Sequence, residues 1–179
     1  VIMTSETHIS GMDRIAEASR LIGLSPETHI LNLQGDEPFM PLDIINTLTS
    51  HLSSLTPIAT ACVPLSNPED IASPNEVKVV RSLSKRAMYF SRSVIPHEFT
   101  ASHDGFLKHL GIYAYSNQTL QELTTLEPTD NELQERLEQL RFLDHGYNIF
   151  VEDYACVPPI GIDTPEDVER AIEFIKSHE

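Results

Sequence analysis

The stretch that decides the fold is residues 30–41, ILNLQGDEPFMP. Its apolar start, residues 30–33, is typical of a buried β-strand, and residues 34–38 bring an amide, a glycine and two carboxylates to the end of that strand. In open α/β sheets, ligands bind beyond the carboxyl ends of the strands. The candidate binding residues here are Gln34, Asp36 and Glu37. The alternative is a polar turn that binds nothing.

Helical and strand-like segments alternate on both sides of this stretch. Apolar spacing predicts helices at 15–22, from Pro41 to Leu52, at 117–125, at 132–144 and from Thr164 onward. Strands are expected at 57–63, 77–80, 87–90, 109–115 and 148–151, and residues 64–75 read as a loop. The early alternation predicts a parallel α/β sheet, and the strand-rich middle, about 77–115, predicts an antiparallel extension of the same single domain.

Composition excludes several classes of protein. The 179 residues carry 12 Lys+Arg and 27 Asp+Glu, so the net charge is −15, and a chain this acidic would repel a nucleic-acid backbone. No apolar run approaches the roughly 18 residues that span a membrane, and no signal peptide is visible, so we expect a cytoplasmic protein with no membrane partner. Cys62 and Cys156 lie in short apolar runs and are expected to be buried, reduced thiols.

A second acidic loop, GIDTPED at residues 161–167, also follows an apolar segment. If Asp36 and Asp163 meet, two carboxylates about 4 Å apart repel by about 4 kcal/mol at an effective dielectric of 20. A divalent cation reverses that sign, and oxygen ligands favour Mg²⁺, which bridges substrate phosphates. The pattern therefore indicates metal-assisted phosphoryl or nucleotidyl transfer. The alternative is that Asp163 only complements the positive end of the next helix.

Six blocks in order along the chain resemble one family, the 3-deoxy-manno-octulosonate (Kdo) cytidylyltransferases, or CMP-Kdo synthetases. The blocks are HISGMDRIAE (8–17), NLQGDEP (32–38), NEVKVV with YFSR (75–80 and 89–92), HLGIY (109–113), LEQLR (137–141) and GIDTPED (161–167). The resemblance covers essentially the whole chain. It implies a Rossmann-like mixed sheet flanked by helices, of the nucleotide-diphospho-sugar transferase type, with a strand-rich extension that forms a homodimer.

The resemblance also implies the reaction. The family transfers CMP from CTP to Kdo, a sugar acid of lipopolysaccharide, and releases diphosphate. The implied metal ligands are Asp36 and Asp163, holding Mg²⁺ at the α-phosphate, with Gln34 where nucleotide and sugar meet. The implied nucleotide-binding residues are Ser10, Gly11 and Arg14. The implied sugar-acid residues are Arg92, His109, Glu138 and Gln139, with Arg92 pairing with the sugar carboxylate.

The sugar-acid residues and Arg14 can also be explained without a bound ligand. Arg92 can be a surface charge after a strand, and His109 can make a local hydrogen bond at a strand start. Glu138 and Gln139 can be ordinary helix surface. Arg14 can form an ion pair with Asp13 or Glu17 on its own helix.

The chain departs from the family pattern in two places. Met12 stands where the family usually has Thr, which removes a hydroxyl near the nucleotide. The chain opens on Val1-Ile2-Met3, as if already within a strand, so we expect that the family's N-terminal strand and its Arg/Lys loop for the triphosphate are missing. The rival interpretations are a cytidylyltransferase for another sugar acid, such as a sialic acid, and a catalytically silent remnant that dimerises or binds a sugar acid.

Overall fold

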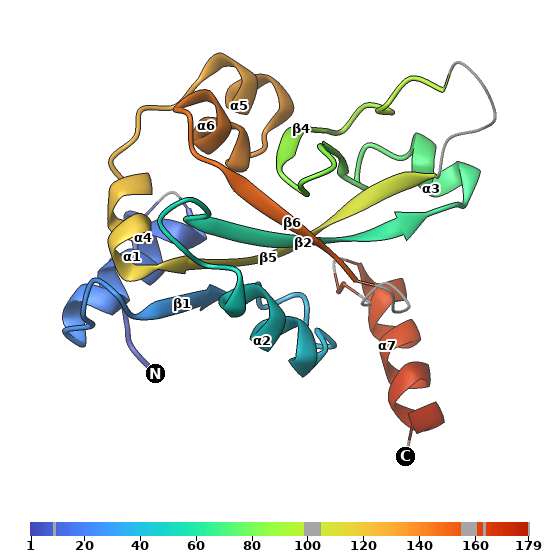
Figure 1. The fold of residues 1–179 in the computed structure, drawn as a ribbon. Coiled ribbons are helices and arrows are strands. Elements are labelled where there is room, and N and C mark those ends of the chain that lie inside the picture. The colour runs from blue at the N-terminus through green and yellow to red at the C-terminus, as the bar shows by residue number, and fades with distance from the viewer. Residues whose placement is uncertain (9, 99–104, 155–160, 163, 179) are drawn as a thin grey trace.

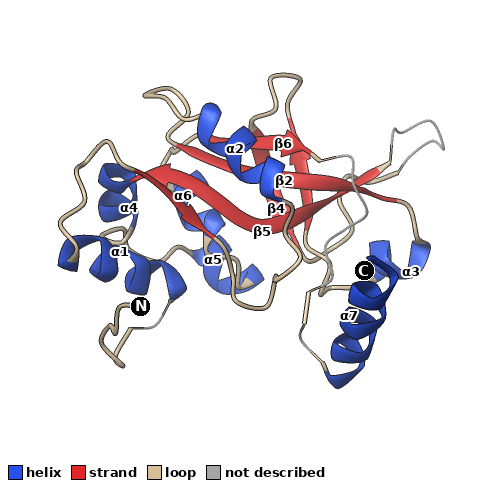
Figure 2. Cartoon of the chain, turned by 90° about the horizontal axis from the view of Figure 1, so that it is seen from below, coloured by secondary structure: helices blue, strands red, loops and turns tan. Residues whose placement is uncertain are grey.

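The computed structural model describes residues 1–8, 10–98, 105–154, 161–162 and 164–178. These residues form a six-stranded mixed sheet with helices on both faces, as Figures 1 and 2 show. The strands are β1 (His29–Asn32), β2 (Ile58–Leu65), β3 (Lys78–Arg81), β4 (Ala87–Ser91), β5 (Phe106–Ser116) and β6 (Ile149–Asp153). The expected α/β class with a mixed sheet is confirmed.

Strand β5 is the centre of the sheet. The order is β4-β3-β5-β2-β6, and β1 also pairs with β5. Strand β5 is antiparallel to β1, β2 and β3, whereas β2 and β6 pair in parallel. Strands β1 and β2 therefore run in the same direction, as expected, but the prediction that they form a parallel sheet together is wrong because β5 lies between them.

The helices divide the core into two layers. They are α1 (Gly11–Leu21), α2 (Leu42–Ser50), α3 (Pro68–Ala72), α4 (Asn117–Leu123), α5 (Asp130–Glu135), α6 (Gln139–Asp144) and α7 (Pro165–His178). Helices α1, α4 and α6 contribute to one apolar cluster, while α2 packs with the alternate residues of β2 and β5 in a second. Figure 2 shows α2 on the face of the sheet opposite α1 and α4.

Three local predictions are wrong. The helix expected at 132–144 is broken into α5 and α6 because Arg136 adopts a left-handed conformation, φ 54°. The Leu137 N–H then closes the end of α5 on the Glu132 carbonyl, at 3.2 Å, as helix C-caps commonly do. The expected loop at 64–75 contains the short helix α3, capped by Asn67. Residues 1–3 form no strand.

Local capping signals position the two helices nearest the acidic loops. Ser10 caps α1, and its hydroxyl and the Asp13 carboxylate form a reciprocal capping box. At α7, the Asp167 N–H donates to the Thr164 hydroxyl at 3.3 Å, and Asp167 accepts from the Thr164 N–H at 2.9 Å. The predicted cap of the last helix is thereby confirmed.

Cys62 is the cysteine that the structure describes, and Cys156 lies outside the described residues. Cys62 is buried on β2 and forms no disulfide. Burial raises the pKa of its thiol to about 11, although Arg81 opposes this rise. The expected structural thiol is confirmed at this position. In the described part of the chain, no helix has the length and apolar character needed to cross a bilayer.

Candidate active site

The two acidic loops meet beyond the carboxyl end of β1. The Ile162 N–H donates to the Asp36 carbonyl at 2.8 Å, and Gly161 lies against the Glu37 side chain and the Asp36 backbone. The rings of Phe39 and Phe174, with centroids 5.1 Å apart, hold α7 against the same loop. Asp163 lies outside the described residues, so its predicted meeting with Asp36 is not described.

The carboxylate oxygens of the two acidic loops are ligands that a hard cation such as Mg²⁺ prefers. The described residues hold no group of three or more His, Cys, Asp or Glu side chains arranged as a metal site. Magnesium does not need such a group, because it usually takes one or two carboxylates, keeps waters and binds substrate phosphates. The Asp36 loop and the loop that leads to Asp163 therefore fit the predicted ion in donor type.

Gln34 sits where three elements converge. Its side-chain amide donates to the Asn32 side chain at 3.1 Å. A methyl group added at Gly11 or at Gly111 would lie 3.9 Å from the Gln34 side chain. Gln34 therefore lies between the start of α1 and the middle of β5, and its place between the two substrates stays a prediction.

A β-bulge in β5 gathers side chains beside Gln34. Thr60 of β2 pairs with Tyr113, but the next residue, Ala61, pairs with Leu110, so two extra residues of β5 are accommodated. In a regular strand, four residues span about 13 Å. Here the rings of His109 and Tyr113 have centroids only 5.4 Å apart. The bulge thus brings together two side chains that a regular strand would keep separate.

The Thr60 hydroxyl determines the hydrogen bonding of His109. The hydroxyl lies 2.7 Å from the Ile112 carbonyl and 3.0 Å from His109 Nε2. If it donates to the closer carbonyl, it accepts from Nε2–H, and Nδ1 of the neutral imidazole is left as an acceptor. Burial lowers the pKa of His109 to about 3, so the ring is neutral at physiological pH. The contact with Thr60 also agrees with the alternative interpretation of His109, in which it makes only a local hydrogen bond.

We expect His109 to weaken the fold as the pH falls. Its pKa is lower in the folded protein than the ordinary 6.5, so the unfolded chain binds the proton first. The contribution is full above about pH 6.5 and is lost as the pH falls toward about 3. His109→Gln should therefore reduce the acid-side slope of the unfolding free energy by up to about 1.4 kcal/mol per pH unit.

Urea unfolding at a series of pH values between neutral and acid measures this slope. The matched control is His145→Gln, because His145 lies on the surface. Parallel curves for His109→Gln and the wild type would show that a neutral buried imidazole is the wrong description.

Glu138 faces both the start of α1 and the bulged strand. Burial raises the pKa of Glu138, and Ser10 and Arg141 oppose this rise. The same carboxylate contributes to the raised pKa of Tyr113, although burial is the main cause there. Gln139 is buried at the first position of α6. Glu138 and Gln139 are therefore not ordinary helix surface.

Arg92 is not a free surface charge. Its guanidinium donates to the carbonyls of Glu135, at 2.8 Å, and Pro74, at 3.0 Å, with a longer contact to Arg136 at 3.4 Å. These contacts use three of its five N–H donors, so a carboxylate would be bound by the remaining two. Arg92 thus joins the end of β4 to the α5–α6 turn at Glu135 and Arg136, and Arg136 lies two residues before Glu138.

The predicted nucleotide residues divide between the site and the surface. Ser10 and Gly11 begin α1 beside Gln34. Arg14 is exposed, and its guanidinium donates to the Ser5 carbonyl at 3.1 Å. The Glu17 carboxylate, one of the two partners considered for an ion pair with Arg14, instead bonds to His8 at 2.5 Å. Ser10 and Gly11 thus lie with the sheet-end residues, whereas Arg14 lies on the outer side of α1.

The chain is similar to proteins of a known family. The family model described as cytidylyltransferase matches residues 1–152. A 3-deoxy-manno-octulosonate cytidylyltransferase of Polynucleobacter necessarius is 44% identical, over 97% of this chain and 70% of the relative. One from Parabacteroides distasonis is 45% identical, over 98% of this chain and 73% of the relative.

The chain belongs to the 3-deoxy-manno-octulosonate cytidylyltransferase family. A solved structure of CMP:2-keto-3-deoxy-manno-octonic acid synthetase complexed with CTP is 37% identical, with a TM-score of 0.91 over 99% of this chain and 73% of that one. The inositol-1-phosphate CTP transferase of T. maritima is only 15% identical, with a TM-score of 0.64, and supports the fold alone.

In this cytidylyltransferase, sequence reasoning missed two tyrosines. Tyr113 and Tyr115 are set on β5, and each has a buried hydroxyl with no hydrogen bond of good geometry within the described part of the chain. Burial raises the pKa of both phenols, so both are neutral donors. The sequence signal is the polar tip of each Tyr within the strand expected at 109–115.

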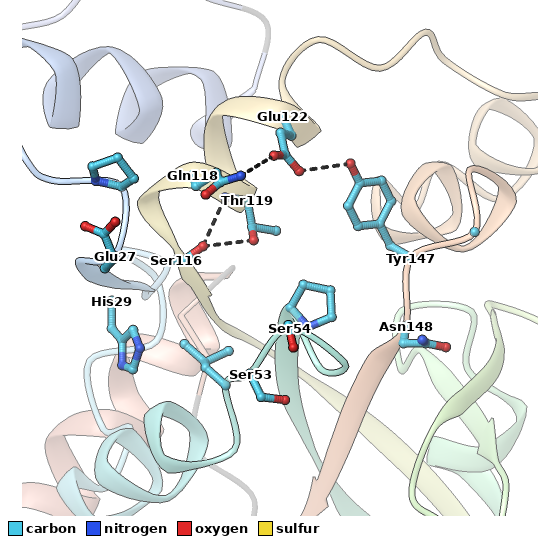
Figure 3. Close-up of a pocket in the computed structure, with 14 residues that line it drawn as sticks. Glu27, His29, Ser53, Ser54, Ser116, Gln118, Thr119, Glu122, Tyr147 and Asn148 are labelled. Carbon is cyan, nitrogen blue, oxygen red and sulfur yellow. Dashed lines mark hydrogen bonds between the residues drawn. The ribbon is translucent and has the colours of Figure 1, made fainter.

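A separate pocket of about 590 Å³ lies at the opposite end of the strands, where β2 and β6 begin and β5 ends (Figure 3). Glu122 lies within it between Gln118, 2.9 Å away, and Tyr147, 3.4 Å away. None of the predicted site residues that the structure describes lines it, so this pocket is not the predicted catalytic centre.

Proposed function

We propose that this chain transfers CMP from CTP to Kdo and releases diphosphate. The observation that carries the proposal is the match to the CTP complex, at a TM-score of 0.91, together with the packing of loop 161–162 on Asp36. The family's relatives carry this activity in their names. Its product is an activated sugar acid.

Asp36 and Asp163 are the proposed ligands of Mg²⁺. The ion would supply charge neutralisation on the α-phosphate of CTP. The contact between Asp36 and Ile162 supports this assignment, because it ties the Asp36 backbone to the residue that precedes Asp163.

The nucleotide would approach the start of α1. An N-terminal helix end offers unsatisfied N–H groups and a positive dipole, which favour an anion. Gly11 opens this end, and Ser10 and Gln34 lie beside it. Arg14 is the least supported nucleotide contact, because it lies on the exposed side of α1 and already donates to Ser5.

The sugar acid would occupy the region lined by His109, Glu138 and Gln139. His109 Nδ1 and the Glu138 carboxylate are acceptors for sugar hydroxyls, and the Gln139 amide can both donate and accept. The two spare N–H groups of Arg92 would bind the sugar carboxylate. The buried Tyr113 hydroxyl is a further donor at the same place.

The reaction is an in-line displacement at phosphorus. The C2 hydroxyl oxygen of Kdo forms a bond to the α-phosphorus, the bond to the diphosphate oxygen breaks, and the hydroxyl proton is released. The protein residues bind and orient the two substrates, and orientation supplies much of the rate in such reactions.

The strand-rich middle of the chain is the proposed dimer contact. The exposed side chains there include Leu83, Met88 and Val94. They lie on or beside the β3–β4 hairpin, whose turn contacts β6 through the hydrogen bond from the Val151 N–H to the Lys85 carbonyl, 2.8 Å long. Exposed apolar groups gathered in one region favour a protein partner, and we propose a second copy of this chain.

Diphosphate release by the full-length protein with CTP and Mg²⁺ tests the function. We expect release with Kdo and none with a sialic acid. Release only with the sialic acid would keep the nucleotide site and overturn the sugar pocket. A folded protein that releases diphosphate with neither would support the silent-remnant interpretation.

A further inference from the structure

Lys78 is a charged residue in an unusual place. It lies on β3 with no exposed surface, although lysine is almost never fully buried unless its charge is paired. Its ammonium donates to the carbonyl of Ser73, at 2.8 Å, and to that of Arg92, at 2.7 Å. Burial lowers the pKa of Lys78, and Glu76 and Glu135 oppose this effect.

Arg92 contacts the same loop as Lys78 and, in addition, the end of α5. Its guanidinium donates to the carbonyl of Pro74, next to Ser73, and to that of Glu135. Lys78 and Arg92 therefore join the loop at 73–74 to the end of β4 from two sides. Lys78 and Arg92 donate to different carbonyls, so neither side chain can satisfy the acceptors of the other.

Glu135 completes the connection to the sugar-acid region. One of its carboxylate oxygens accepts from the Ser91 hydroxyl at 2.6 Å, and the other accepts from the Arg92 N–H at 2.9 Å. Glu135 ends α5, directly before the left-handed Arg136. The position of the Arg92 backbone thus sets the position of the turn that leads to Glu138 and Gln139.

We propose that Lys78 is a positioning residue for the sugar-acid pocket, acting through the backbone of Arg92 and the carboxylate of Glu135. The inference rests on the proposed function, because it assigns the α5–α6 turn to sugar binding. A lysine is required at this position because an apolar side chain of similar length would remove the donor from the carbonyls of Ser73 and Arg92, which are only partly exposed to solvent.

Lys78→Met tests the proposal, since methionine keeps the length and removes the donor. We expect the KM for Kdo to rise about 10- to 100-fold, the range that loss of a hydrogen bond to a charged group gives, while the KM for CTP stays within about twofold. The matched control is Lys108→Met. Lys108 pairs with Lys78 across the β3–β5 ladder but contacts Glu76, so both KM values should stay near wild type.

A double-mutant cycle separates positioning from general loss of structure. If Lys78 acts through Arg92, Lys78→Met should add little to the Kdo KM of Arg92→Ala, because coupled residues are not additive. Full additivity, or equal rises in KM for Kdo and CTP, would overturn the proposal.

Glu135→Gln is the second variant if Lys78→Met fails to fold, as judged by circular dichroism. It keeps one acceptor oxygen and perturbs the same connection from the other side, so the Kdo KM should again rise selectively. An unchanged Kdo KM in this variant would overturn the inference alone. A wild-type protein that gives no turnover with Kdo would instead overturn the proposed function and this inference with it.

Discussion

Asp36→Asn should lower kcat by about 10³-fold or more while leaving the fold intact. The substitution removes one negative charge at the proposed metal and keeps the side-chain size, and charge stabilisation by preorganised groups at a reacting phosphate is worth several kcal/mol. The fold should survive because the contact of this residue with Ile162 uses the backbone carbonyl, which the substitution does not touch. Initial rates of diphosphate release at saturating CTP and Kdo measure the effect.

The matched control for this variant is Asp43→Asn. Asp43 is exposed at the start of α2, a few residues after the same loop, and its side chain accepts from the Tyr154 hydroxyl at 2.8 Å, a role that an amide oxygen can keep. We expect near wild-type rates there. Wild-type rates in Asp36→Asn at every Mg²⁺ concentration would remove Asp36 from the metal site.

Arg92→Ala should raise the KM for Kdo by about 100-fold or more and affect the KM for CTP far less. Loss of a charge-assisted contact with a carboxylate contributes about 1.5–3 kcal/mol, and the carbonyls of Pro74 and Glu135 would also lose their common donor. Steady-state kinetics with each substrate varied in turn distinguishes the two KM values.

Arg92→Lys and Arg86→Ala make this result interpretable. Lysine keeps the charge but loses the planar fork, so the Kdo KM should still rise. Arg86 is exposed at the other end of the same strand, and its removal should change neither KM. An equal loss for both substrates in Arg92→Ala would show that the residue supports the fold and does not bind the sugar carboxylate.

The parts of the fold that the sequence predicts well carry local signals. Residues 30–33 form a strand and residues 34–38 follow its carboxyl end because an apolar run stops abruptly at polar residues. The start of α7 follows from Thr164, Pro165 and the carboxylates after them, which cap and complement a helix end regardless of what lies around it.

The parts that the sequence does not predict depend on distant partners. Nothing within residues 132–144 signals a break, since Arg136 is neither glycine nor asparagine, and its left-handed conformation is held by contacts with Arg92 and the end of α5. The bulge in β5 likewise depends on Thr60 of another strand. The grouping of His109 with Tyr113 therefore could not be found from the spacing of the residues alone.

The central place of β5 has a consequence for how the protein folds as it is synthesised. Strands β1 and β2 can pair with β5 only after residue 106 and those that follow it have left the ribosome. Strand β2 pairs with β6 later still, because β6 is synthesised after β5. At a synthesis rate of about 5–20 residues per second, β1 remains without that partner for several seconds. During this interval the apolar segments of β1 and β2 have no shared partner strand, and the strong negative charge of the chain opposes its association with other copies.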